Sequence, residues 1–438
     1  DKLKTWMEEN KITTGINIDG DSKRTYPYES LASNVIGFYG NDKGLEGIEA
    51  AWENELSGTP GRIVTSANVN REAISDEKYL NQAILENKAS GGCVVIMRPS
   101  TGDILAEASY PTYNLNTPFS PNTPELEAIW DTLTQEQKSA ELNNMWRNKP
   151  ISDGYEPGSV FKLITASIGL EENLVETDTP NDFYCNKVYK VANYDINCWA
   201  DNAHGALSLR KAIEKSCNPS FIQLGQRIGK DRFYKYLQAF GLLDKTGVRM
   251  SGEANSIFFS KDNCHEVELA TMSFGQRFKV TPIQLITAVS ACVNGGNLMQ
   301  PRIVSKVVNT DTGVETELPP VKVRQVISEA TSSKIKSMME SAVTTGTGKY
   351  AAVTGYSVGG KSGTSEPDPN KPEEGYVASF LAISPVENPE VVVLVALFNP
   401  NPDGSGSHQG GAIAAPVASQ ILSDILPHLG IASTATDE

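Results

Sequence analysis

A serine and a lysine stand three residues apart, at Ser159 and Lys162, directly after the turn-forming pair Pro157-Gly158. An apolar run from 160 to 170 predicts a helix, so Ser159 is expected at its N-terminus with Lys162 one turn away on the same face. A neutral amine there can take the hydroxyl proton as the oxygen attacks an acyl carbon. The helix dipole favours the negative charge that then develops. The pair therefore predicts a serine nucleophile for acyl transfer.

Ser-x-x-Lys alone is common, and its usual meaning is a solvated helix face. Two later stretches change this interpretation: Ser216-Cys217-Asn218 and Gly359-Gly360-Lys361-Ser362-Gly363-Thr364. Each is weak evidence by itself, because serine and asparagine before Pro219 are ordinary turn residues. The three stretches in this chain order, however, form the motif set of penicillin-binding proteins and class A β-lactamases.

With these motifs the chain resembles the class B penicillin-binding proteins, the D,D-transpeptidases that cross-link peptidoglycan. The resemblance covers nearly the whole chain and is strongest to the division and sporulation enzymes of Gram-positive bacteria. Further segments carry it: Gly44-Leu45-Glu46-Gly47-Ile48-Glu49, Ala108-Ser109-Tyr110-Pro111-Thr112-Tyr113, Ser273-Phe274-Gly275-Gln276, Thr281-Pro282 and Gly346-Thr347-Gly348. It implies a donor stem peptide ending in D-Ala-D-Ala and inhibition by β-lactams, which mimic that donor.

The resemblance also implies a role for each motif residue. Ser159 is the nucleophile, and Lys162 is the base for acylation, with a pKa lowered by burial and by a neighbouring cation. Lys361 is the expected neighbour and attracts the substrate carboxylate. Ser216 is expected to bridge the two lysines and to relay the proton to the leaving amine. Asn218 is expected to orient Lys162 and the substrate amide.

The third motif is expected to hold the substrate. The backbone N–H groups of Ser159 and Thr364 would form the oxyanion hole. The hydroxyls of Ser362 and Thr364 would bind the terminal carboxylate, and Gly363 would leave room for the substrate backbone. One departure from the family pattern is Gly275-Gln276-Arg277, where the family often has Gly-Gln-Gly, and Arg277 could alter substrate or drug entry.

A cysteine- and histidine-rich stretch precedes the second motif and predicts a metal site. Thiolate and imidazole ligands suit zinc, whose role would be structural because the chemistry needs no cofactor. The predicted ligands are Cys185, Cys198, Asp201 and His204, with Asp195 or Cys217 as alternatives for the fourth position. A disulfide between Cys185 and Cys198, or free thiols, are the other interpretations.

Composition narrows the class of partner. The 438 residues include 38 Lys and Arg against 53 Asp and Glu, so the formal net charge is −15. This balance argues against nucleic acid and against docking on anionic lipid by charge alone. No apolar run reaches the ~18 residues of a membrane helix. The resemblance nevertheless implies one N-terminal anchor missing from the chain, an extracytoplasmic catalytic domain, a separate glycosyltransferase partner, and membrane proteins of division or sporulation.

The predicted fold is α+β, with an N-terminal pedestal module (1–90) and a transpeptidase domain (91–438). The domain is expected to have the penicillin-binding and serine β-lactamase-like fold. Two early and three late strands would form one antiparallel sheet with helices on both faces, and an all-helical subdomain would be inserted between them. In the pedestal, a helix is expected at 45–56 and a strand from 61. The stretch 70–83 is shorter than expected for the family, which suggests a deleted or disordered loop.

Two other functions fit some of these motifs. A serine β-lactamase uses the same motif set but must deacylate fast, and no residue for that step is identified. A non-enzymatic β-lactam sensor or cell-wall scaffold is the second alternative, although sensors lack the pedestal.

Overall fold

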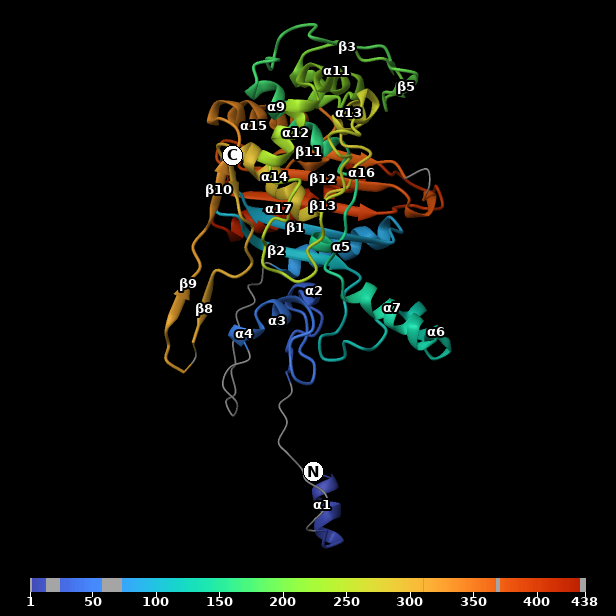
Figure 1. Ribbon diagram of the computed structural model, residues 1–438, viewed down its shortest axis with the longest axis vertical. Helices are drawn as coiled ribbons and strands as arrows, with labels where there is room; N and C mark the ends of the chain where they lie inside the picture. Colours follow the sequence, from blue (N-terminus) through green and yellow to red (C-terminus); the bar gives the residue numbers. More distant parts are fainter. Residues whose placement is uncertain (1, 13–23, 57–72, 310, 368–370, 434–438) are drawn as a thin grey trace.

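A five-stranded antiparallel sheet lies at the centre of the molecule, with the strand order β11-β12-β13-β1-β2 (Figure 1). The computed structural model describes residues 2–12, 24–56, 73–309, 311–367 and 371–433. The strands are β1 (Gly91–Arg98), β2 (Asp103–Tyr110), β11 (Gly359–Ser365), β12 (Val377–Ser384) and β13 (Val391–Phe398). The predicted sheet of two early and three late strands is therefore confirmed, and the third motif lies on an outer strand.

Helices cover both faces of this sheet. On one face, α5 (Ala73–Glu86) and α17 (Ala415–His428) pack Leu80, Ile84 and Ile421 against the strands. On the other face lie α9 (Lys162–Glu171), α14 (Pro282–Val293) and α15 (Glu329–Thr344). Every residue of α14 is buried, as expected for a helix that is apolar on all sides.

A lobe above this second face carries the first two motifs. It includes η2 (Gly158–Phe161), α10 (Leu209–Glu214), α11 (Asn218–Ile228), α12 (Lys230–Ala239) and α13 (Glu266–Met272). Residues 209–239 form three successive helices, because the backbone φ is positive at Ser216 and at Gly229.

The prediction that this lobe is all-helical was wrong. It also contains two small antiparallel sheets, one from β3 (Phe183–Cys185) and β6 (Gly205–Leu207), the other from β4 (Val188–Val191) and β5 (Tyr194–Asn197). These strands have three or four residues each, too few to give a clear periodic signal.

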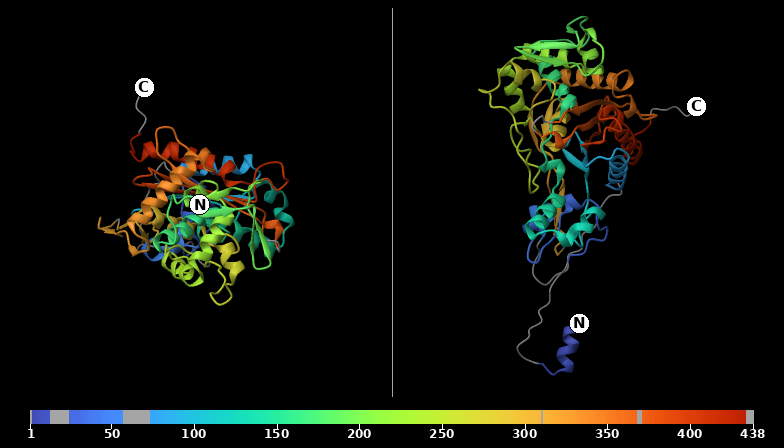
Figure 2. Two further views of the ribbon diagram at one scale, coloured as in Figure 1. Left: turned by 90° about the horizontal axis from the view of Figure 1, so that it is seen from above. Right: turned by 90° about the vertical axis from the view of Figure 1, so that its right-hand side faces the viewer.

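The pedestal lies at the opposite end of the sheet from this lobe (Figure 2). Its described helices before α5 are α1 (Lys2–Glu9), α2 (Ser33–Ile36), α3 (Gly47–Ala51) and α4 (Glu53–Leu56). The helix expected over 45–56 is therefore split at Trp52. Although α5 also falls within residues 1–90, it packs on the central sheet. The strand expected from residue 61 lies outside the described residues, and the 70–83 stretch is helical from Ala73 onward in α5. Among the described residues, no helix is long and apolar enough to span a bilayer.

The remaining elements extend from this core. An arm follows β2 and consists of α6 (Pro124–Ile129), η1 (Trp130–Thr132) and α7 (Gln135–Trp146), with Thr134 and Gln137 capping the start of α7. The other elements are α8 (Lys149–Ser152), β7 (Asn297–Met299), β8 (Lys306–Val308), β9 (Glu315–Glu317), β10 (Lys322–Gln325), η3 (Lys349–Ala351), η4 (Pro372–Glu374) and α16 (Gly410–Ile413).

Candidate active site

Ser159 lies in the 3₁₀ turn η2 that leads into α9, and Ser159 is half-buried. Gly158 before it has a φ of 54°, and a Cβ there would sit 2.7 Å from the Thr364 carbonyl oxygen. Only glycine therefore allows the Ser159 turn to approach β11 this closely. The N–H of Ser159 is at the start of the helical segment, where backbone donors lack an intrahelical acceptor.

The second motif lies at the break between α10 and α11. Ser216 has a φ of 51°, a left-handed conformation that is uncommon outside glycine and that tends to occur at functional sites. Lys162 Nζ donates hydrogen bonds to the Ser216 carbonyl oxygen (2.8 Å), to Asn218 Oδ1 (2.7 Å) and, at 3.4 Å, to Ser216 Oγ. The lysine amine and the second motif thus form one connected network.

The third motif brings a second amine to the same serine. Lys361 Nζ donates to Ser216 Oγ at 2.9 Å and to the Ser362 carbonyl oxygen at 3.0 Å. Ser216 Oγ therefore lies between the two lysines, which come from different elements of the domain. Among the described residues, neither amine has a carboxylate partner within salt-bridge distance.

Burial without a counter-charge controls the ionisation of these amines. Both lysine side chains are 0% exposed. Burial lowers the pKa of Lys162 to about 7, although the nearby thiols of Cys217 and Cys198 act in the opposite direction. Burial, together with the neighbouring Lys162, holds the pKa of Lys361 well below its usual value. A large fraction of Lys162 is therefore neutral near neutral pH.

The hydroxyls of the third motif have partners that the sequence motifs did not reveal. Ser362 Oγ lies 3.1 Å from Thr347 Oγ1, and Thr364 Oγ1 accepts a hydrogen bond from the Gly410 N–H at 3.1 Å. Packing within the domain also requires glycine at position 363, because a Cβ there would lie 2.4 Å from Ser379 Oγ and 2.9 Å from the Pro157 carbonyl oxygen. Thr347 belongs to the segment 346–348 that carries the family resemblance, but the sequence assigns it no partner. Gly410 lies far from β11 along the chain, and no sequence signal links it to this strand.

The predicted metal ligands meet on the other side of the second motif. Ligand atoms of Cys185, Cys198, His204 and Cys217 all lie within 4.8 Å of one another. Cys198 Sγ is 3.5 Å from His204 Nδ1. Asp201 is outside this group, and Cys217, one of the predicted alternatives, takes the fourth place. All six cysteines are free thiols, so Cys185 and Cys198 are not joined by a disulfide.

Two thiols of this group, which we call the Cys/His cluster, shift each other's pKa in opposite directions. A hydrogen bond from Cys217 lowers the pKa of Cys198 to about 4, and His204 acts in the same direction. The same hydrogen bond, with burial, raises the pKa of Cys217. Three sulfurs and an imidazole at this spacing match the donor set of a structural zinc site.

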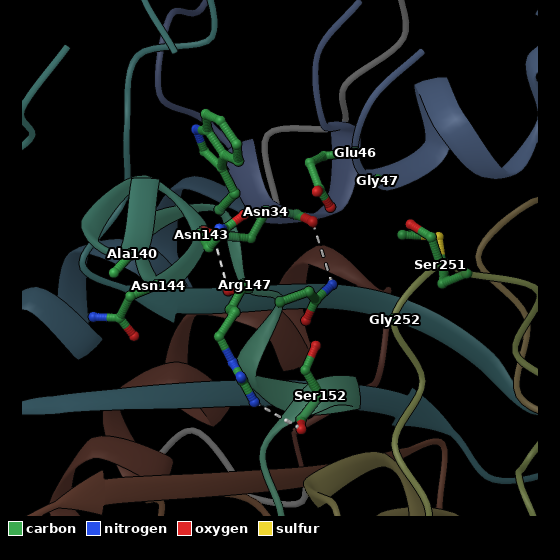
Figure 3. Close-up of a pocket in the computed structure, with 13 residues that line it drawn as sticks. Asn34, Glu46, Gly47, Ala140, Asn143, Asn144, Arg147, Ser152, Ser251 and Gly252 are labelled. Carbon is green, nitrogen blue, oxygen red and sulfur yellow. Dashed lines mark hydrogen bonds between the residues drawn. The ribbon is translucent and has the colours of Figure 1, made fainter. Parts of the chain in front are cut away.

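A separate hollow of about 450 Å³ lies where the pedestal meets the catalytic domain (Figure 3). Asn34 and Glu46 line it from the pedestal, and Arg147 and Ser152 line it from the other side. Asn34 Nδ2 donates to the Arg147 carbonyl oxygen at 3.0 Å, which ties the two parts together. None of the three motifs lines this hollow, so it is distinct from the candidate active site.

Comparison with known proteins places this geometry in a family. The family model described as the penicillin-binding protein transpeptidase domain matches residues 92–423, and the penicillin-binding protein dimerisation domain matches residues 1–84. Stage V sporulation protein D of Bacillus subtilis is 34% identical over 95% of this chain and 66% of its own length. The peptidoglycan D,D-transpeptidase FtsI of Escherichia coli is 29% identical over 95% of this chain and 69% of its own length.

Solved structures agree with these matches. Penicillin-binding protein 3 of Mycobacterium tuberculosis superposes with a TM-score of 0.79 at 26% identity, over 94% of this chain and 91% of that one. The D,D-transpeptidase domain from Eggerthella lenta gives a TM-score of 0.78 at 27% identity, over 95% of both chains. The chain spans about two thirds of the length of the curated relatives, 66% and 69%. The chain therefore belongs to the class B penicillin-binding proteins, in agreement with the three motifs and the hydrogen bonds that join Lys162, Ser216 and Lys361.

Proposed function

We propose that this protein is a serine D,D-transpeptidase that cross-links peptidoglycan stem peptides ending in D-Ala-D-Ala. The observation that supports this most directly is the buried Lys162 amine, which is held by Ser216 and Asn218 without a counter-charge. An amine with a pKa of about 7 is a base that works at neutral pH. The reaction needs no cofactor.

In the proposed mechanism, Ser159 Oγ attacks the penultimate D-Ala carbonyl and its proton passes to neutral Lys162. No hydrogen bond joins Ser159 Oγ to Lys162 Nζ among the described residues, and such contacts often form only with substrate bound. The backbone N–H groups of Ser159 and Thr364 would stabilise the oxyanion. Terminal D-Ala then leaves as an amine, protonated through Ser216.

The acyl-serine ester is then attacked by the amine of a second stem peptide, which restores the Ser159 hydroxyl. Lys361 and the Ser362 and Thr364 hydroxyls would bind the terminal carboxylate. As an outer strand of the sheet, β11 offers an unpaired backbone edge to the donor peptide. β-Lactams would acylate the same serine, and their slow release would make them inhibitors.

Exchange of the terminal D-Ala tests this proposal. Incubation with a D-Ala-D-Ala pentapeptide and a labelled D-amino acid should give labelled tetrapeptide-D-amino acid product, and Ser159→Ala should give none. Rapid turnover of nitrocefin would favour a β-lactamase instead. Penicillin acylation without any exchange by the wild type would favour a sensor or scaffold.

We also propose a structural zinc ion bound by Cys185, Cys198, His204 and Cys217. Their ligand atoms already lie within 4.8 Å of one another, and three of the four residues are buried. Because Cys217 lies between Ser216 and Asn218, zinc would brace the loop that holds Lys162. Metal analysis of protein before and after chelation tests this: absence of stoichiometric zinc with an unchanged melting temperature would contradict it.

The cellular setting follows from the family and is likewise proposed. We infer a pedestal over residues 1–90 and a catalytic domain over 91–438. We place the catalytic domain outside the cytoplasmic membrane on an N-terminal anchor. It would work there with a separate glycosyltransferase and with membrane proteins of division or sporulation. Fractionation of the full-length protein from its native cells tests the location.

A further inference from the structure

The segment 275–280 runs alongside the residues that lead into Ser159. The Gly158 N–H donates to the Gly275 carbonyl oxygen at 2.9 Å, and Tyr155 and Val280 exchange two backbone hydrogen bonds of 3.0 Å. Phe278 packs its ring at 4.7 Å from the ring of Phe161, two residues after the nucleophile. This segment, the flanking segment, is therefore part of the wall around the candidate active site.

Two cations lie on the flanking segment, and their environments differ. Lys279 Nζ pairs with Glu374 at 3.0 Å, so its charge is matched. Arg277 is exposed, and its guanidinium has no hydrogen bond or ion pair among the described residues. The chain as a whole has a net charge of −15. The Arg277 guanidinium, two residues from Gly275 at the wall of the site, has no partner among the described residues and is therefore available to bind an anionic ligand.

The backbone at Arg277 also argues against a neutral surface position. Its φ is 65°, in the left-handed region where glycine fits at no cost and arginine does not. A strained residue beside an active site is an observation that points to function. A guanidinium, moreover, is the side chain best suited to bind a carboxylate through two hydrogen bonds.

The direction of the donor peptide locates the ligand of Arg277, and this step rests on the proposed function. There, Lys361 and the Ser362 and Thr364 hydroxyls hold the terminal carboxylate, and the Thr364 N–H holds the penultimate carbonyl oxygen. The rest of the donor therefore continues beyond Thr364 toward Gly158. Gly158 contacts the Thr364 backbone there, and Gly275 contacts Gly158 in turn. The upstream part of the donor therefore passes the flanking segment.

We propose that Arg277 binds a free carboxylate on the side chain of the donor residue that precedes D-Ala-D-Ala. Arg277 would thus be a specificity-determining residue that favours a diamino-dicarboxylic acid at this position. The same peptide with that carboxylate amidated, or with lysine in its place, would be a poorer donor. The reacting groups themselves are not affected.

Two pentapeptide donors that differ only in this carboxylate, free or amidated, test the proposal. The measured quantity is the ratio of kcat/KM for terminal D-Ala release from the two donors. We expect wild type to prefer the free carboxylate, and Arg277→Gly to lower that preference about tenfold or more, as for loss of a charge-assisted hydrogen bond. Glycine suits the backbone at this position, so the variant should fold.

Arg249→Gly is the matched control, because Arg249 is also an exposed arginine with a positive φ of 56° but lies against Trp52 of the pedestal. It should keep the wild-type ratio. Equal activity of wild type on both donors, or an equal loss on both donors in Arg277→Gly, would overturn the proposal. Penicillin labelling of every variant is measured in parallel: wild type that is labelled but releases D-Ala from neither donor would instead overturn the proposed function.

Discussion

Residues 216–218 separate two buried clusters whose chemistry differs. On one side, Ser216 and Asn218 hold the Lys162 amine through oxygen atoms. On the other, Cys217 joins two further thiols and an imidazole. The first side offers hydrogen-bond acceptors to an amine, and the second offers electron pairs to a soft metal ion. The two proposed roles, catalysis for Ser216 and Asn218 and local stability for Cys217, would thus fall on alternate residues of one short motif.

We expect the largest effect on acylation from removal of the Lys162 amine. Lys162→Met should lower the second-order rate of acylation by a fluorescent penicillin about thousandfold, since it removes the general base. Lys334→Met, which changes a half-buried lysine paired with Glu176, should keep the wild-type rate. A loss of less than tenfold in Lys162→Met would mean that another group accepts the Ser159 proton.

Removal of a metal ion from the Cys/His cluster should change the stability of the protein while leaving Lys162 intact. Chelation of the zinc-loaded wild type should lower its free energy of unfolding by about 3 kcal/mol, the effect of a ligand present at a hundred times its dissociation constant. Cys217→Ala should lose this response to chelator, measured by thermal melting. Cys93→Ala removes a buried sulfur outside the cluster and should keep it. The same chelator response in both variants would exclude Cys217 as a ligand.

The pH dependence of acylation tests the amine side without mutation. The lysine acts as a base only when neutral, and the pKa of Lys162 is about 7 in the folded protein. The rate should therefore rise about tenfold per pH unit below this value and level off above it, giving a difference of about a hundredfold between pH 5 and pH 8. A rate that is flat over this range would place the amine pKa elsewhere.

The smallest expected effect comes from the hydroxyl shared by the two lysines. Ser216→Ala should lower the acylation rate about tenfold, because Lys162 keeps its bonds to the Ser216 carbonyl oxygen and to Asn218. Ser167→Ala serves as the control, because it removes a buried hydroxyl on α9 that makes no contact with either lysine amine among the described residues. A thousandfold loss in Ser216→Ala would make the hydroxyl, not Lys162, the main route for the proton.

The two sides also differ in how far the sequence predicts them. Ser159, Lys162 and Lys361 could be singled out because fixed spacings and chain order restrict their chemistry. The fourth member of the Cys/His cluster could not, because nothing local distinguishes Asp201 from Cys217. Whether Asp201 or Cys217 joins the cluster depends on the turn at Ser216. This residue takes a left-handed conformation that the sequence pattern does not predict.

In the fold, too, elements with a clear sequence pattern were predictable, whereas features set by tertiary contacts were not. The long apolar strands and α14 were predictable because burial on both faces leaves a continuous apolar run. The short strands β3 to β6 were missed, since three or four residues carry little pattern. Gly363 is constrained by the Pro157 carbonyl oxygen, a contact that tertiary packing alone creates.

Mass spectrometry of the protein after treatment with penicillin tests the central claim most directly. One covalent adduct should form, and digestion should locate it on the peptide that contains Ser159. Ser159→Ala should carry none. An adduct on a different side chain of the wild type, or no adduct at saturating penicillin, would contradict the assignment of Ser159 as the acylated nucleophile.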